Sequence, residues 1–106
     1  MNYEGHHIYH VYIITNQSKS VLYIGVTNYL ARRLHEHNRN ILDKKKTFAA
    51  QYNCRHLLYF EKFTWIQKAI AREKEIKAWR REKKMNLIKT INPNLNFLEY
   101  LFPFEP

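Results

Sequence analysis

The sequence has few of the residues that break regular structure or cross-link a chain. Its 106 residues include one cysteine, two glycines and three prolines. A single cysteine forms no disulfide within the chain, and so little glycine and proline excludes collagen-like and low-complexity chains.

No long apolar run is present. The longest near the start, Val11 to Ile14, is far short of the roughly 20 residues of a membrane span. Residues 1–7 lack the apolar core of a secretory signal, so we expect a cytoplasmic protein with no membrane partner.

Positive charge is what the sequence has in excess. It holds 18 Lys and Arg against 9 Asp and Glu, a formal net charge of +9, with 45% hydrophobic and 15% aromatic residues. This length fits a single domain over residues 1–106, with a core over about 9–96 and an apolar tail over 97–106. Such a charge on so small a domain predicts a polyanionic partner, and nucleic acid fits best.

Three segments have the Ile, Val and Tyr content that is typical of β-strands, at residues 8–14, 21–25 and 57–60. The polar stretch between the first two predicts an antiparallel hairpin. If its turn is symmetric, Tyr12 lies directly opposite Tyr23, and both side chains leave the same face of the sheet.

The remaining segments have helical periodicity. A cap at Thr27 or Asn28 predicts a helix whose apolar stripe includes Leu30 and Leu34. Two more helices are expected over residues 64–81 and 82–90. The predicted order is strand, strand, helix, strand, helix, helix. This order indicates an α+β domain in which helices flank a small three-stranded antiparallel sheet.

Three polar side chains lie on or beside apolar helix faces. Helical geometry places His37 and Arg33 next to the leucine stripe of the first helix, and Glu73 in the apolar arc of the second. The same geometry places Arg32 and Glu75 away from the apolar stripes of their helices, toward solvent. Charged groups in such positions are costly unless they are paired or functional. They indicate either an ion pair between Arg33 and Glu73, or a pocket suited to phosphate chemistry.

The motifs resemble those of the GIY-YIG nuclease superfamily, in its small stand-alone branch. The matching segments are Val11-Tyr12, Tyr23-Ile24-Gly25, the run from Asn28 to His37, Ala71 to Lys77, and Asn92-Pro93-Asn94. The first motif departs from the family's usual pattern, because His10 and Val11 replace the Gly-Ile that precedes the tyrosine. The resemblance covers roughly residues 9–96.

The resemblance implies a nuclease that hydrolyses phosphodiester bonds, with DNA favoured over RNA, using one divalent metal, Mg²⁺ or Mn²⁺. It implies catalytic roles for Tyr12, Tyr23 and Arg33, and it places His37 where the family has His or Tyr. It implies that Glu73 is the metal ligand. It also matches Asn92 to a late asparagine of the family.

The sequence leaves the general base open between Tyr12 and His37. A free phenol has a pKa near 10 and is a poor base at neutral pH, whereas the ordinary imidazole pKa suits proton transfer. Tyr23 would assist Tyr12. We expect Gly25 to permit a tight strand-to-helix turn and close approach of the substrate.

Two groups of basic residues are candidate phosphate contacts that would hold a backbone without reading sequence. They are Lys44, Lys45, Lys46, and Arg80, Arg81, Lys83, Lys84. A domain that binds nucleic acid without cutting it, and an interaction protein that meets an acidic partner, are the alternative functions. We expect a monomer or a weak homodimer, with the apolar tail acting as a lid on the core or as the dimer contact.

Overall fold

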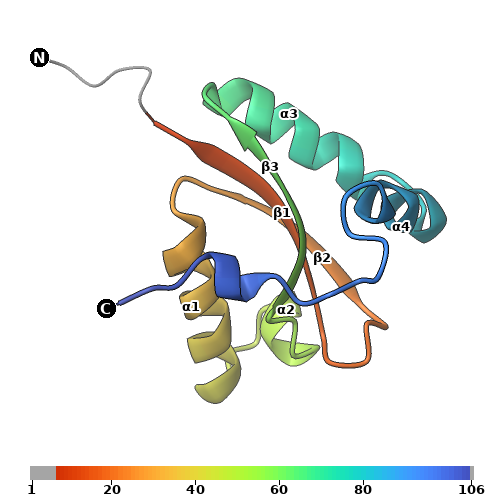
Figure 1. The fold of residues 1–106 in the computed structure, drawn as a ribbon. Coiled ribbons are helices and arrows are strands. Elements are labelled where there is room, and N and C mark those ends of the chain that lie inside the picture. Colours follow the sequence, from red (N-terminus) through yellow and green to blue (C-terminus); the bar gives the residue numbers. More distant parts are fainter. Residues whose placement is uncertain (1–6, 106) are drawn as a thin grey trace, which may run out of the picture.

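The computed structural model describes residues 7–105, in which helices cover both faces of a three-stranded antiparallel sheet (Figure 1). The elements in chain order are β1 (Tyr9–Thr15), β2 (Leu22–Thr27), α1 (Leu30–Leu42), α2 (Phe48–Gln51), β3 (His56–Phe63), α3 (Ile66–Lys77), α4 (Arg81–Lys89) and the short 3-10 helix η1 (Glu99–Leu101). The α+β class and its three-stranded sheet are therefore confirmed. In the described part of the chain, no helix is long and apolar enough to cross a membrane.

The register of the β1–β2 hairpin corrects one expectation. Strand β1 is central, in the order β2-β1-β3, and Tyr12 pairs with Gly25 rather than with Tyr23. The connection spans residues 16–21, one residue later than the symmetric turn requires, and the Asn16 carboxamide oxygen accepts from the backbone N–H groups of Ser20 and Val21. A shift of two residues keeps each side chain on its face, so the tyrosines still share a face.

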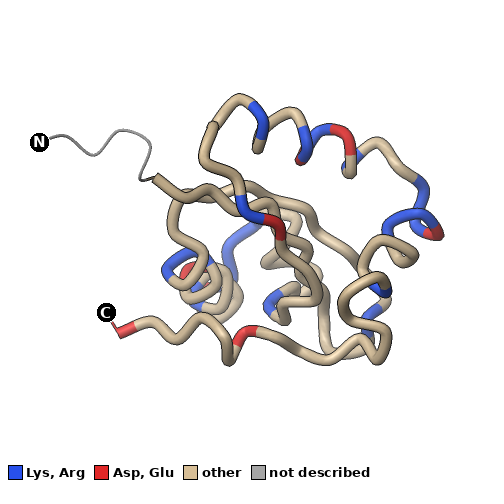
Figure 2. The backbone as a smooth tube through the Cα atoms, turned by 45° about the horizontal axis from the view of Figure 1, so that its top comes forward, with Lys and Arg blue, Asp and Glu red and all other residues tan. Residues whose placement is uncertain are grey.

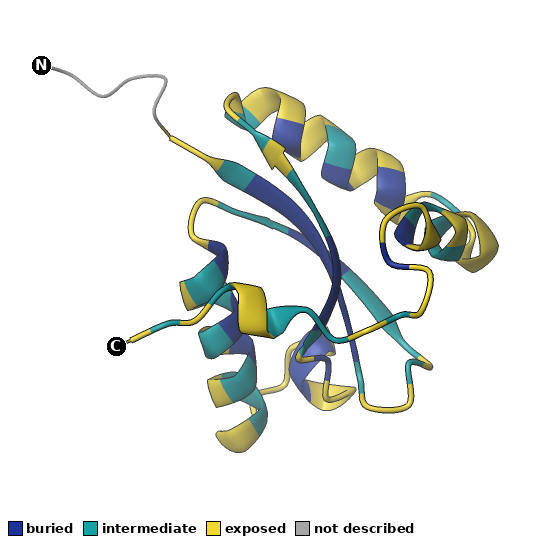
Figure 3. Ribbon diagram, viewed as in Figure 1, coloured by how far each residue is buried: buried dark blue, intermediate teal, exposed yellow. Residues whose placement is uncertain are grey.

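The alternation of side chains along the strands gives the sheet two apolar faces. On one face, Val11, Ile13 and Ile24 pack with Ala69 and Ile76 of α3, and we call this the α3 face. The other, the α1 face, contains the remaining strand side chains and the buried residues of α1 and α2. Its members are Tyr12, Ile14, Leu30, Leu34, Ala49, Cys54 and Leu57. Figure 3 shows both layers of buried residues.

Two helices follow β3, as the sequence indicated, but the first ends before the expected residue 81. Helix α3 ends at Lys77, and the extended backbone of Arg80 (ψ 158°) separates it from α4. The one-turn helix α2 was not expected at all. Its signal is a single cap, since the Thr47 hydroxyl accepts from the N–H of Ala50.

The segment after α4 returns across the α1 face. The N–H of Leu98 donates to the carbonyl of Leu57 at 2.8 Å, and the ring of Phe102 packs edge-on against Phe60. The His56 ring stacks on Phe97 with centroids 3.9 Å apart. The apolar tail therefore packs beside α1 within the same molecule (Figure 1).

Candidate active site

A buried hydrogen bond between Tyr12 and His37 joins the sheet to α1. Tyr12 Oη lies 2.8 Å from His37 Nε2, and the two side chains are 1% and 2% exposed. Tyr12 comes from the central strand and His37 from the buried stripe of α1. Two buried polar groups from distant segments thus satisfy each other.

The absence of a side chain at Gly25 makes room for this pair. A Cβ built there would lie 2.4 Å from Cζ and from Oη of Tyr12. Gly25 lies inside β2, with Val26 and Thr27 still in the strand and α1 starting at Leu30. The expected role in a strand-to-helix turn is therefore wrong. This glycine instead lets the phenol ring lie against the neighbouring strand.

Burial sets the protonation of both partners. It lowers the pKa of His37 to about 4, with the positive charge of Arg33 acting in the same direction. It raises the pKa of Tyr12 well above its usual range, although Arg33 opposes this shift. At neutral pH the pair is a neutral phenol and a neutral imidazole. In the tautomer whose Nε2 is unprotonated, the imidazole accepts the hydrogen bond and the phenol O–H donates it.

Arg33 and Tyr23 complete a cluster of four side chains around this bond. The Tyr23 ring centroid lies 6.4 Å from that of Tyr12 and 5.4 Å from that of His37. Burial disfavours the charge of Arg33, but Tyr12 and Glu36 outweigh this effect and the pKa of the guanidinium is raised. Its Nη1 donates to Glu36 Oε1 at 3.1 Å. The structure thus brings together four of the residues singled out in the sequence.

Glu73 is not brought to this cluster. It is 9% exposed and shares the buried side of α3 with Ala69 and Ile76, which pack on the opposite face of the sheet. Its carboxylate pairs with the Lys77 ammonium one helical turn away. Within residues 7–105, no hydrogen bond or ion pair joins Glu73 to the four, and Arg33 pairs with Glu36 instead. Of the two alternatives that the sequence left open, the Arg33–Glu73 ion pair is therefore not formed, and the cluster contains Arg33 and His37 without Glu73.

Asn92 anchors the loop that follows α4. Its Nδ2 donates to the carbonyls of Leu58 and Asn96, and its Oδ1 accepts from the N–H of Asn96. The side chain is buried, and both ends of its carboxamide are used inside the protein. Asn92 thus attaches the loop after α4 to strand β3, next to the core in which α4 packs on the α3 face.

The two basic groups lie on different sides of the sheet. Lys44, Lys45 and Lys46 are exposed in the segment that links α1 to α2, on the side of the four clustered residues. Arg80, Arg81, Lys83 and Lys84 lie at the start of α4, beyond the α3 face (Figure 2). Arg81 is also occupied, because its guanidinium donates to the carbonyls of Lys19 and Ser20. Of the two groups, only the lysines are on the same side of the sheet as the cluster.

His10 takes the place of the family's usual glycine and is buried beside the α1 face. It is 8% exposed, and neither ring nitrogen has a hydrogen-bond partner among the described residues. Its ring packs edge-on against Phe60 and Phe102. Burial, with the charge of Lys62, lowers the pKa of His10 and keeps it neutral. His10 therefore packs against aromatic rings rather than donating to the cluster.

Phe48, on α2, is the neighbour of the cluster that sequence reasoning missed. Its ring stacks on that of Tyr23, with centroids 6.4 Å apart and planes at 25°. The available signal was Thr47 as a helix cap immediately before an aromatic residue.

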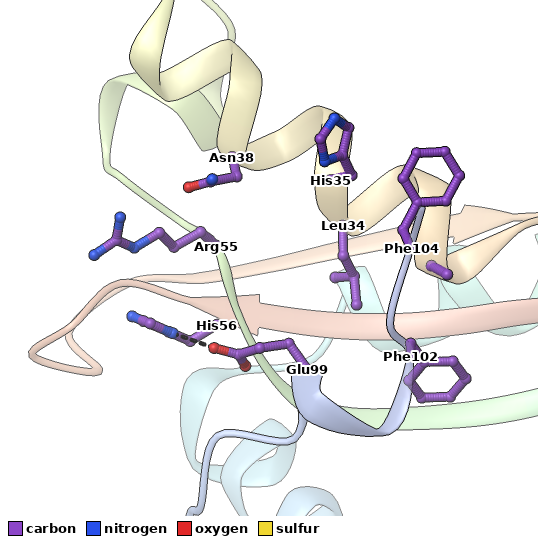
Figure 4. A pocket seen from close by; sticks show the side chains of 9 residues that line it. Leu34, His35, Asn38, Arg55, His56, Glu99, Phe102 and Phe104 are labelled. Carbon is purple, nitrogen blue, oxygen red and sulfur yellow. Dashed lines mark hydrogen bonds and ion pairs between the residues drawn. The ribbon is translucent and has the colours of Figure 1, made fainter. Parts of the chain in front are cut away.

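A separate hollow of about 340 Å³ lies between α1 and the C-terminal segment (Figure 4). His56 Nδ1 and Glu99 Oε2 are 2.5 Å apart at its edge, and Leu57 N–H donates to Glu99 Oε1. The lining contains none of the four clustered residues. The hollow is therefore distinct from the candidate active site.

A small antiparallel α+β domain that carries two tyrosines on neighbouring strands, with arginine and histidine one turn apart on the next helix, has the architecture of a GIY-YIG domain. The model of the GIY-YIG catalytic domain matches residues 8–86. The chain therefore belongs to the GIY-YIG family, which places it in a nuclease superfamily and implies interaction with nucleic acid.

Two relatives agree with this assignment. The chain is 35% identical over 79 residues to a UPF0213 protein of Haloquadratum walsbyi, covering 74% of this chain and 85% of the relative. It is also similar to the solution structure of a UPF0213 protein from Bacillus halodurans. That comparison has a TM-score of 0.51 and 25% sequence identity, and covers 82% of this chain and 88% of the other.

Proposed function

We propose that this protein is a divalent-metal-dependent endonuclease that hydrolyses phosphodiester bonds, with DNA as the favoured substrate. The observation that supports it best is the buried Tyr12–His37 hydrogen bond beside the Arg33 guanidinium. A core that needed only packing would place apolar side chains at positions 12 and 37, because a buried phenol and imidazole add polar groups that must be satisfied.

The pair can accept one proton from an attacking water. The water would transfer its proton to Tyr12 Oη while the phenol proton moves to His37 Nε2, 2.8 Å away. The phenol is then regenerated and the imidazole carries the charge. The anionic phosphate of a bound substrate would stabilise that charge, against the burial that disfavours it in the free protein.

Arg33 is suited to bind the phosphate. A guanidinium can hold two phosphate oxygens through parallel N–H donors and meet the extra negative charge of the transition state. Its present partner, Glu36, is about half exposed, so a phosphate can compete for the same donors at small cost. Tyr23 would orient the same phosphate or its water.

Glu73 is the residue that would hold Mg²⁺ or Mn²⁺. Magnesium keeps several of its waters and binds through one or two carboxylates plus substrate phosphate, so a single buried carboxylate fits it chemically. Within the described residues, no three acidic, histidine or cysteine side chains gather as a metal cage, so an ion held by Glu73 would have to keep most of its waters. When bound, such an ion would supply charge stabilisation at a phosphate and its leaving oxygen. Because α3 and α1 cover opposite faces of the sheet, this role requires a substrate that reaches both Glu73 and Arg33.

The test is a cleavage assay on single-stranded, branched and duplex DNA and on RNA, with Mg²⁺ and with a chelator. Tyr12→Phe removes the transferable proton and keeps the ring, so cleavage should fall by about 10² or more while folding is retained. Cleavage at the original rate by Tyr12→Phe would contradict the proton path. Cleavage that survives both Glu73→Ala and the chelator would contradict the metal dependence.

A binding module without turnover is the second candidate. The position of Glu73 favours it, because its carboxylate is paired with Lys77 and lies on the helix that covers the other face. On this hypothesis the wild-type protein binds nucleic acid with an affinity that falls steeply with salt, and cuts none of the substrates with any metal.

A further inference from the structure

A row of aromatic rings leads from the buried Tyr12–His37 pair to the surface of α2. Tyr23 packs against both members of the pair, and Phe48 stacks on Tyr23. Tyr52 then packs on Phe48, with ring centroids 4.7 Å apart. The two outer rings, Phe48 and Tyr52, are 52% and 48% exposed, and we call them the aromatic step.

The aromatic step is held in place by its own short helix. The Thr47 hydroxyl caps α2, and Ala49 and Ala50 are buried beneath it. The N–H of Cys54 donates to the carbonyl of Ala49 at 2.8 Å and closes the turn after the helix. The alanines thus fix α2 on the α1 face while the larger rings point outward. Rings held in this way lose little conformational freedom when a planar ligand stacks on them.

The charge next to the aromatic step favours a phosphate backbone. Lys44, Lys45 and Lys46 are exposed and directly precede α2. None of the three pairs with a carboxylate in the part of the chain that the structure describes. Exposed aromatic rings beside a basic segment form the combination that binds single-stranded nucleic acid, where bases stack and lysines follow the phosphates.

We propose that Phe48 and Tyr52 stack unpaired bases next to the phosphate held by Arg33, so that the substrate is single-stranded nucleic acid or an unpaired stretch within it. In a duplex, neighbouring base pairs cover both faces of each interior base, and no face is left for Phe48. This proposal rests on the proposed function for the placement of the phosphate. It adds the substrate class and names the residues that select it.

The experiment measures binding in the presence of a chelator, so that no cleavage is needed. A labelled oligothymidylate and a blunt-ended duplex of matched length, with no loop, are titrated with wild-type protein, Phe48→Ala, Tyr52→Ala and Phe48→Trp. Trp65→Ala is the control, because Trp65 is 65% exposed but precedes α3 on the other side of the sheet. The alanine variants should bind the single strand about tenfold more weakly and the duplex unchanged. Phe48→Trp and Trp65→Ala should match the wild type.

A direct readout of stacking comes from an oligonucleotide that carries 2-aminopurine. Wild-type protein should quench its fluorescence, and the double variant F48A/Y52A should not. Equal losses on single strand and duplex, or an equal loss from Trp65→Ala, would overturn the base-stacking proposal.

The same proteins separate this proposal from the proposed function. In one outcome, Phe48→Ala and Tyr52→Ala lose single-strand binding selectively while the wild type cleaves nothing at any Mg²⁺ concentration. That result would overturn the proposed nuclease activity and support base stacking on the aromatic step. Cleavage of duplex that is as fast as cleavage of single strand, and unchanged in Phe48→Ala, would support the nuclease and overturn the substrate class.

Discussion

The phenol ring of Tyr12 occupies the space in which a side chain at Gly25 would begin. The two residues pair across β1 and β2, and a Cβ on Gly25 would come within 2.4 Å of the phenol. The position of the Tyr12 ring therefore depends on the absence of a side chain at Gly25. A change at the glycine should act on the buried pair that we assign to proton transfer.

Gly25→Ala should displace the Tyr12 ring and lengthen its hydrogen bond to His37. Forcing a methyl group into a packed core costs about 1–3 kcal/mol, so the urea midpoint should fall. Cleavage should fall further than stability explains when it is measured under conditions where the variant is folded. Val26→Ala, at the next position of β2 and on the other face, is the control for stability alone. A Gly25→Ala protein with wild-type stability and cleavage would contradict this coupling.

The hairpin register shows where sequence reasoning succeeds and where it stops. The symmetric turn predicted that Tyr12 and Tyr23 share a face, and this is correct although their direct pairing is wrong, because a two-residue slip preserves alternation. It did not predict that Gly25 faces Tyr12, since that depends on where the loop around Asn16 begins. The register of a hairpin follows from its loop, and side-chain capping of that loop has no periodic signal.

Helical periodicity was similarly informative about burial but not about neighbours. It predicted that His37 and Glu73 lie on the apolar sides of their helices, and both are buried. It could not predict that α1 and α3 cover opposite faces of the sheet. Burial is a property of one helix, whereas convergence depends on which face each helix covers. The contact between Phe48 and Tyr23 was also missed, because a helix of a single turn gives no periodic pattern in the sequence.

Acid should destabilise the protein through His37. Its pKa is about 4 when folded and near 6.5 when unfolded, so between these values the unfolded chain binds more protons. Stability should fall as the pH decreases from about 6.5 to about 4, by at most about 1.4 kcal/mol per pH unit from this group. Burial lowers the pKa of His10 as well, which adds a loss of the same sign.

The measurement is the urea midpoint as a function of pH for wild-type, His37→Gln and His10→Phe proteins. His37→Gln should be less stable at neutral pH and less sensitive to acid. His10→Phe should lose only the smaller part of the acid sensitivity. A wild-type midpoint that is flat from pH 6.5 to pH 4 would show that neither ring is buried in its neutral form.

Asn92→Ala should weaken folding without touching the reaction. It leaves the carbonyl of Leu58 and the N–H of Asn96 without their side-chain partner inside the protein. Buried groups left unsatisfied cost about 1–3 kcal/mol each, so the urea midpoint should fall clearly. The rate of cleavage per folded molecule should stay the same. A large loss of cleavage at unchanged stability would instead assign Asn92 to the chemistry.

Lys77→Ala tests whether Glu73 is available to a metal. The ammonium of Lys77 pairs with the Glu73 carboxylate, so a cation must displace it before binding there. Removing the lysine leaves a buried carboxylate without its partner, which should strengthen Mn²⁺ binding, measured by electron paramagnetic resonance of the free ion. Glu73→Ala should abolish that binding in both backgrounds.

Lys74→Ala, an exposed neighbour on α3, is the matched control for the general loss of positive charge. Mn²⁺ affinity that rises equally in Lys74→Ala and Lys77→Ala would reflect net charge alone. Mn²⁺ binding that survives Glu73→Ala would place the ion elsewhere, and the metal role of α3 would be wrong.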